Sequence, residues 1–150
     1  MKHLALAALA AALLLVPAAP ARAADPIDGV LAPYFRIQDQ LADDKTETVK
    51  ADADLLAQAA SALGTAGEPL ASAARALSSA TGLAPARDAF GALSDALIAY
   101  ANGTHAAVGA DTATMYCPMV RKSWLQHGDE IRNPYFGKSM LGCGTVKKKG

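Results

Sequence analysis

Apolar residues recur every three or four positions in four stretches of the chain between residues 26 and 103. Such spacing gathers apolar side chains on one face of an α-helix, and a composition rich in Ala and Leu with few β-branched residues also favours helix. The pattern predicts helices over residues 26–42, 46–63, 69–80 and 85–101, with short breaks between them. Four amphipathic helices joined by short turns indicate an all-α fold, an up-down four-helix bundle, followed by an ordered C-terminal loop segment.

The first residues follow a different pattern, in which Lys2 precedes an uninterrupted apolar run over residues 4–16. The tripeptide Ala21-Arg22-Ala23 then supplies the small-x-small pattern that a signal peptidase recognises. A helix over that run would be about 20 Å long, which is too short for a bilayer core of about 30 Å. The sequence therefore predicts a cleavable signal peptide over residues 1–23, export to the periplasm, and no membrane span in the mature chain.

Residues 24–150 have the length of one domain, with the predicted bundle over 24–104 and the loop segment over 112–146. Charge divides the chain in a similar way. Residues 25–111 contain 12 acidic and 5 basic residues, whereas residues 112–150 contain 2 acidic and 7 basic residues. Mutual attraction between the two parts accounts for this division, and export argues against a nucleic-acid partner. The lysines at 147–149 are expected to form a solvated tail.

The composition changes after residue 111. Both cysteines, the single Trp and three of the four Met lie between residues 112 and 150. Pro or Gly occurs at six positions between 118 and 144, which forbids a long helix. We expect an ordered loop segment that packs on the bundle, with one helical turn or a short hairpin as its only regular structure.

Four sulfur-containing residues of this segment form two close pairs. Cys117 and Met119 are spaced as C-x-M, and Met140 and Cys143 as M-x-x-C. If the segment folds back on itself, the four sulfurs can converge on one ion, and thiolate and thioether ligands select Cu(I) and Ag(I). A zinc site is disfavoured because the spacing matches no typical zinc pattern. Further side chains that can complete or replace a ligand are Met115, His127 and His105.

The two cysteines also have a purely structural interpretation. Exported chains mature in an oxidising compartment, where two cysteines usually pair. A disulfide between Cys117 and Cys143 would close a loop of about 26 residues and contribute roughly 3–4 kcal/mol. In this alternative the protein is an interaction module of the envelope without a metal, and its contact surface consists of Trp124, Tyr135 and Phe136.

The tail resembles the C-terminal signature of the DUF3347 family, and Ala86-Arg87-x-Ala89-Phe90 resembles part of that family's helical body. In the family this domain occurs alone behind a signal peptide, or fused to periplasmic adaptor subunits of heavy-metal efflux systems. The resemblance implies a periplasmic protein linked to copper, with an efflux adaptor or another envelope protein as its partner. The matching elements of the tail are Tyr116-Cys117-Pro118-Met119, Trp124-Leu125, Asn133-Pro134-Tyr135-Phe136-Gly137 and Met140-x-x-Cys143-Gly144.

The sequence does not favour an enzyme. A thiol oxidoreductase typically carries C-x-x-C at a helix N-terminus, whereas Cys117 and Cys143 are 26 positions apart. The chain also lacks a glycine-rich phosphate loop. We therefore expect a protein that binds a copper-type metal and acts as an accessory to metal efflux or homeostasis.

Overall fold

The computed structural model of the protein describes residues 26–149. The predicted signal peptide over residues 1–23 lies outside this part of the chain. Among the described residues, no helix combines the length and the apolar character that crossing a membrane requires.

Four α-helices form where the apolar periodicity predicts them. They are α1 (Asp28–Ala42), α2 (Val49–Ser61), α3 (Glu68–Ser78) and α4 (Leu83–Thr104), and a short 3-10 helix, η1 (Gly64–Gly67), connects α2 to α3. Pro69 occupies the first turn of α3, where its missing N–H has no helical partner to lose. At the other end of the body, His105 takes a left-handed conformation that ends α4.

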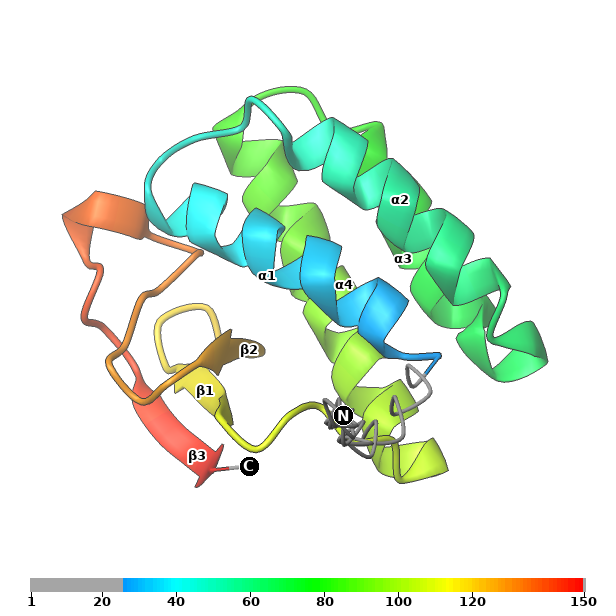
Figure 1. Cartoon of the computed structure of the whole chain (residues 1–150). Coiled ribbons are helices and arrows are strands. Elements are labelled where there is room, and N and C mark those ends of the chain that lie inside the picture. The colour runs from blue at the N-terminus through cyan, green and yellow to red at the C-terminus, as the bar shows by residue number, and fades with distance from the viewer. Residues whose placement is uncertain (1–25, 150) are drawn as a thin grey trace, which may run out of the picture.

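The helices pack in chain order, with α1 against α2, α2 against α3 and α3 against α4 (Figure 1). Arg36 of α1 forms an ion pair with Asp52 of α2, in which the Arg36 Nε donates to the buried Asp52 carboxylate at 2.7 Å. Small side chains at the interfaces let the helix backbones approach closely. The buried alanines of this core include Ala53, Ala57, Ala60, Ala71, Ala74 and Ala86.

The prediction of an all-α fold, a pure four-helix bundle, is wrong. After α4 the chain forms an antiparallel sheet of three strands, β1 (Thr112–Cys117), β2 (Lys122–His127) and β3 (Thr145–Lys149), in the order β2-β1-β3. The alternation of Thr and apolar residues in β1 suits a pleated strand that is buried on one side. The closing lysines, predicted as a solvated tail, extend the sheet through their backbone. Strand β3 carries almost no apolar side chains, so the apolar pattern of the sequence does not indicate this strand.

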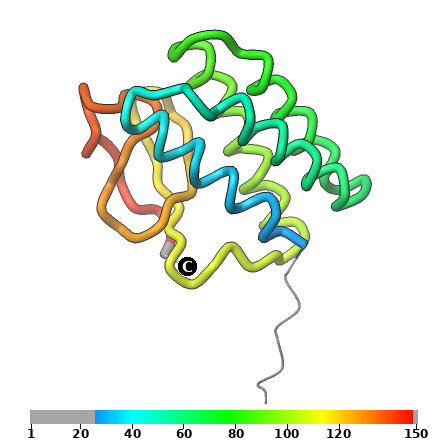
Figure 2. The backbone as a smooth tube through the Cα atoms, turned by 45° about the horizontal axis from the view of Figure 1, so that its top comes forward, coloured from blue at the N-terminus to red at the C-terminus, as the bar shows by residue number. Residues whose placement is uncertain are grey.

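The sheet has two differently covered faces. Leu125 of β2 lies on the face that Ile98 and Ala101 of α4 approach. The backbone N–H of Leu125 donates to the Tyr34 hydroxyl of α1 at 3.1 Å. Met115 and Trp124 are directly opposite each other in the ladder, so they share the other face. The connection over residues 128–144 covers that second face, with the ring of Tyr135 edge-on to Trp124 at 5.8 Å. Figure 2 shows this connection, in orange to red, gathered with the sheet on one side of the helices.

The hydroxyl of Tyr34 joins the helices to the sheet. It accepts the bond from the Leu125 N–H and lies 2.7 Å from Ser94 Oγ on α4. Because the Tyr34 oxygen already accepts from Leu125, its own hydrogen is available to Ser94. The ring stacks on Phe90 of α4 at 5.1 Å. Burial raises the pKa of Tyr34, so the group stays neutral and retains its hydrogen.

Candidate functional site

The pairing of β1 with β3 brings the two cysteines to the same end of the sheet. Tyr116 pairs with Thr145, and the strands run antiparallel, so Cys117 and Cys143 flank this pair on the same side. Both cysteines are free, and the predicted disulfide is therefore wrong for this structure. Cys117 is fixed by the alternation of β1 inside the core, whereas Cys143 is half-buried in a turn that precedes β3.

Asn133 holds the turn that carries Cys143. The Cys143 N–H donates to the Met140 carbonyl at 3.0 Å, which closes the turn. The Asn133 side chain donates to the Cys143 carbonyl at 2.6 Å and accepts from the Tyr135 N–H at 2.8 Å. Partial burial raises the pKa of the Cys143 thiol, and the Cys117 thiol raises that pKa further. The M-x-x-C spacing thus corresponds to one closed turn, which begins at Met140 and ends at Cys143.

The three methionines of the predicted site lie in different environments. Met119 is in the turn between β1 and β2, two residues beyond Cys117, and is 64% exposed. Met140 is half-buried at the start of the turn that ends at Cys143. Met115 is completely buried beside Trp124 in the core. Met140 and Met119 therefore lie near the two cysteines with access to solvent, whereas Met115 belongs to the packed interior.

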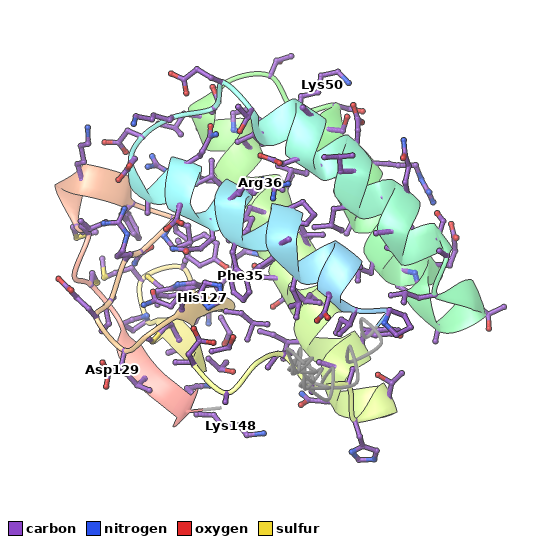
Figure 3. All side chains as sticks on the ribbon, viewed as in Figure 1. Phe35, Arg36, Lys50, His127, Asp129 and Lys148 are labelled. Carbon is purple, nitrogen blue, oxygen red and sulfur yellow. The ribbon has the colours of Figure 1, made fainter. Side chains whose placement is uncertain are left out.

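The structure separates the histidines from the cysteines. His127 pairs with Thr112, at the opposite end of the β1–β2 ladder from Cys117. Its Nδ1 lies 3.2 Å from Asp111 Oδ2, and its ring lies 3.9 Å from the ring of Phe35 (Figure 3). His105 ends α4. Within residues 26–149, His, Cys, Asp and Glu side chains form no group of three or more that could hold a metal ion.

The aromatic residues predicted as a contact surface are instead part of the interior. Trp124 is 0% and Tyr135 7% exposed, and Phe136 is half-buried against the core. The Tyr135 hydroxyl donates to the Ser123 carbonyl at 2.6 Å. The sheet needs apolar cover on both faces, and these rings supply it on the face of Met115 and Trp124, where the Tyr135 ring also lies 6.1 Å from Phe90 of α4.

An ionic clasp, made by Arg87, Asp44 and the residues that they bind, fixes the connection over residues 128–144 to the helices. Arg87 of α4 donates through Nε to the Pro134 carbonyl at 2.9 Å and through Nη2 to Asp44 Oδ1 at 2.5 Å. Asp44, just after α1, also accepts from the Lys138 N–H at 3.3 Å. Gly137 has a φ of +55°, and a Cβ there would overlap Asp44 Oδ1 and Arg87 Nη2. The clasp thus requires a glycine at this position.

Arg132 supplies a second attachment near the other end of the connection. Its Nη2 donates to Asp43 Oδ1 at 2.7 Å, and its carbonyl accepts from Gln38 Nε2 at 2.8 Å. The Arg132 N–H donates to the buried Gln126 side chain at 3.0 Å. Sequence reasoning missed both attachments. The Asp43-Asp44 pair ends a helix, and this local role gives no indication of ion pairs to residues far along the chain.

The clasp predicts a stability that depends on pH. The hydrogen bond from Arg87 holds the pKa of Asp44 below its ordinary value of 3.8, and the Lys138 N–H lowers it further. Such a carboxylate stabilises the fold fully above the unfolded-state pKa, and the contribution is lost as pH falls through the folded-state pKa. In urea unfolding we expect Asp44→Asn to be less stable than the wild type above about pH 5, with the difference shrinking below about pH 4.

Exposed Asp88 of α4 provides the control for this measurement. Above about pH 5 we expect Asp44→Asn to lose more stability than Asp88→Asn, which removes a carboxylate outside the clasp. If the difference between the wild type and Asp44→Asn stayed constant down to about pH 2.5, the carboxylate would not be stabilised by the clasp.

Comparison with models of protein families, with curated proteins and with solved structures finds no match for this chain. The resemblance of the tail to the DUF3347 family therefore stays a prediction. Among the described residues, the sulfur-containing side chains of Cys117, Cys143, Met119 and Met140 lie in or beside the turns at one end of the sheet.

Proposed function

We propose that the protein binds a soft, monovalent metal ion of the copper type in the periplasm. The ligands are the thiolates of Cys117 and Cys143 and the thioether of Met140, and Met119 is a further ligand from the neighbouring turn. One observation carries the proposal: antiparallel pairing of β1 and β3 sets two free cysteines at the same end of the sheet, with Met140 in the turn that closes on Cys143.

The donor set fits such an ion. Thiolate and thioether sulfur select Cu(I), whereas carboxylate and water ligands suit harder cations. The two turns that carry these sulfur side chains lie at the same end of the sheet, and the histidines lie elsewhere. Because the pKa of the Cys143 thiol is raised, metal binding must displace its proton. The proposed ligands are therefore two thiolates and one or two thioethers.

The scaffold supports reversible binding and transfer. Cys117 is buried, but Cys143 and Met140 are half-buried and Met119 is exposed, so an ion can be delivered from one side. The ionic clasp and the Asn133 bonds fix the turn that carries Cys143 and Met140. The predicted export and the resemblance to the DUF3347 family add the setting: an accessory to metal efflux, with an efflux adaptor or another envelope protein as its partner.

A competition titration tests this function. The reduced protein, kept anaerobic, is titrated with Cu(I) in the presence of a chromophoric Cu(I) chelator. We expect one equivalent of Cu(I) to move from the chelator to the protein. Met140→Leu, which keeps the volume but removes the sulfur, should weaken the affinity by at least about tenfold, because changes even in the outer shell of a site cost 10–100-fold.

His127→Gln is the matched control, since His127 lies at the far end of the β1–β2 ladder. Its affinity for Cu(I) should equal that of the wild type. The proposal fails if the chelator retains all of the Cu(I), or if His127→Gln weakens binding while Met140→Leu does not.

A further inference from the structure

A pocket of about 640 Å³ lies between the C-terminal half of α4 and the sheet. Thr114 and Leu125, which pair across β1 and β2, line it from the sheet face turned toward the helices. Cys117 belongs to the opposite face, because its side chain alternates with those of its neighbours along β1. The pocket is therefore separate from the proposed metal site, and its size is typical of sites for small organic ligands, about 300–1,000 Å³.

The walls of this pocket have two different characters. Ile98 of α4, Val108 of the following connection and Leu125 give it an apolar side. Lys147 and Lys148 of β3 give it a cationic side, and none of the acidic residues between 26 and 149 lines it. In Figure 3, Lys148 lies at the end of β3, beside the connection from α4 to β1.

The two lysines are available to a ligand. Lys147 Nζ lies 4.3 Å from the centre of the Tyr116 ring, and within residues 26–149 neither lysine takes part in an ion pair that the structure records. Two cations close together on one wall of a pocket attract an anion. The C-terminal end of α4 carries partial negative charge, which directs the anionic group toward β3 and away from the helix.

We propose that this pocket binds an amphipathic organic anion, a carboxylate with a hydrocarbon body. The carboxylate lies at Lys147 and Lys148, and the hydrocarbon packs on Ile98, Val108 and Leu125. Burial of each methylene of the ligand stabilises the complex, while the lysines select the charged head group. This site requires no metal, so its test is independent of the proposed copper function.

The test compares two ligands of equal chain length by NMR. The ¹⁵N-labelled protein is titrated with octanoate below its micelle concentration, and separately with octan-1-ol. We expect saturable shifts of the amides of Val108, Thr114 and Leu125 with octanoate, and weaker binding of the alcohol. Combining Lys147→Ser with Lys148→Ser should weaken the affinity for octanoate about three- to tenfold, as expected for two exposed charge pairs. The affinity for octan-1-ol should stay unchanged.

Two further variants complete the design. Lys50→Ser with Lys138→Ser removes the same charge from surfaces outside the pocket and should leave octanoate affinity unchanged. Thr114→Trp fills the pocket and should abolish the shifts of both ligands. The proposal is overturned if octanoate and octan-1-ol bind with equal affinity, or if the pocket amides do not shift. It is also overturned if the two double-lysine variants lose octanoate affinity to the same extent.

Discussion

Replacing both cysteines by serine is expected to weaken Cu(I) binding on the order of 10³-fold or more, because a neutral hydroxyl is a poor ligand for a soft ion. Cys117→Ser and Cys143→Ser, made singly, should each lose less Cu(I) affinity than the double variant, since the other thiolate and Met140 remain. The same competition titration measures these affinities. Cys117 is fully buried, so circular dichroism of the Cys117→Ser, Cys143→Ser protein must show that the fold is intact.

Met115→Leu is the matched control for this variant. Met115 is a buried sulfur on the same face of β1, two residues before Cys117, and it packs in the core. Its replacement by a residue of similar volume should leave Cu(I) affinity within about twofold of the wild type, because such swaps are well tolerated. If the Cys117→Ser, Cys143→Ser protein is folded and keeps the Cu(I) affinity of the wild type, neither thiolate is a ligand of the metal.

Gly137→Ala is expected to destabilise the fold by about 2–3 kcal/mol. The φ of Gly137 is +55°, a conformation that is strained for residues with a Cβ. In addition, the new methyl group would overlap Asp44 and Arg87, so the ion pair between them must separate or the backbone must move. Urea unfolding followed by the fluorescence of the single Trp measures the change, since Trp124 lies under the connection that Gly137 belongs to.

Gly142→Ala provides the comparison within the same connection. Nothing lies within 4 Å of a Cβ at Gly142, and its φ is outside the left-handed region. This change should leave stability within about 0.5 kcal/mol of the wild type or raise it slightly, because Ala restricts the unfolded chain. Equal effects of the two substitutions would mean that the clasp does not depend on a glycine at 137.

The helices could be predicted because their information is local. The apolar spacing over α1 to α4 recurs within each helix, and glycine and proline mark the breaks. The sheet could not be predicted in the same way. Strands β1 and β2 are each six residues long and lie in a segment where Gly and Pro are frequent, and β3 pairs with β1 across a connection of 27 residues. Pairing of this kind depends on long-range contacts that periodicity does not report.

In the candidate site, too, local spacing could be read from the sequence, whereas contacts between distant segments could not. The C-x-M and M-x-x-C spacings predicted that two sulfur pairs would meet, and the β1–β3 register places their cysteines at one end of the sheet. His127 was a reasonable candidate by residue type alone, but the length of the β1–β2 ladder separates it from Cys117. The clasp of Arg87 and Asp44 joins residues 43 positions apart, and no local pattern identifies such a pair.

X-ray absorption at the copper edge of the reduced, Cu(I)-loaded protein tests most directly whether Cys117, Cys143 and Met140 hold the metal. We predict a first shell of sulfur alone at about 2.3 Å, as in other metal–thiolate bonds. In Met140→Leu the number of sulfur neighbours should fall, while in His127→Gln the spectrum should match the wild type. A first shell dominated by nitrogen or oxygen, or a spectrum that changes with His127 and not with Met140, would contradict the assignment of the metal to the sulfur ligands at the end of the sheet.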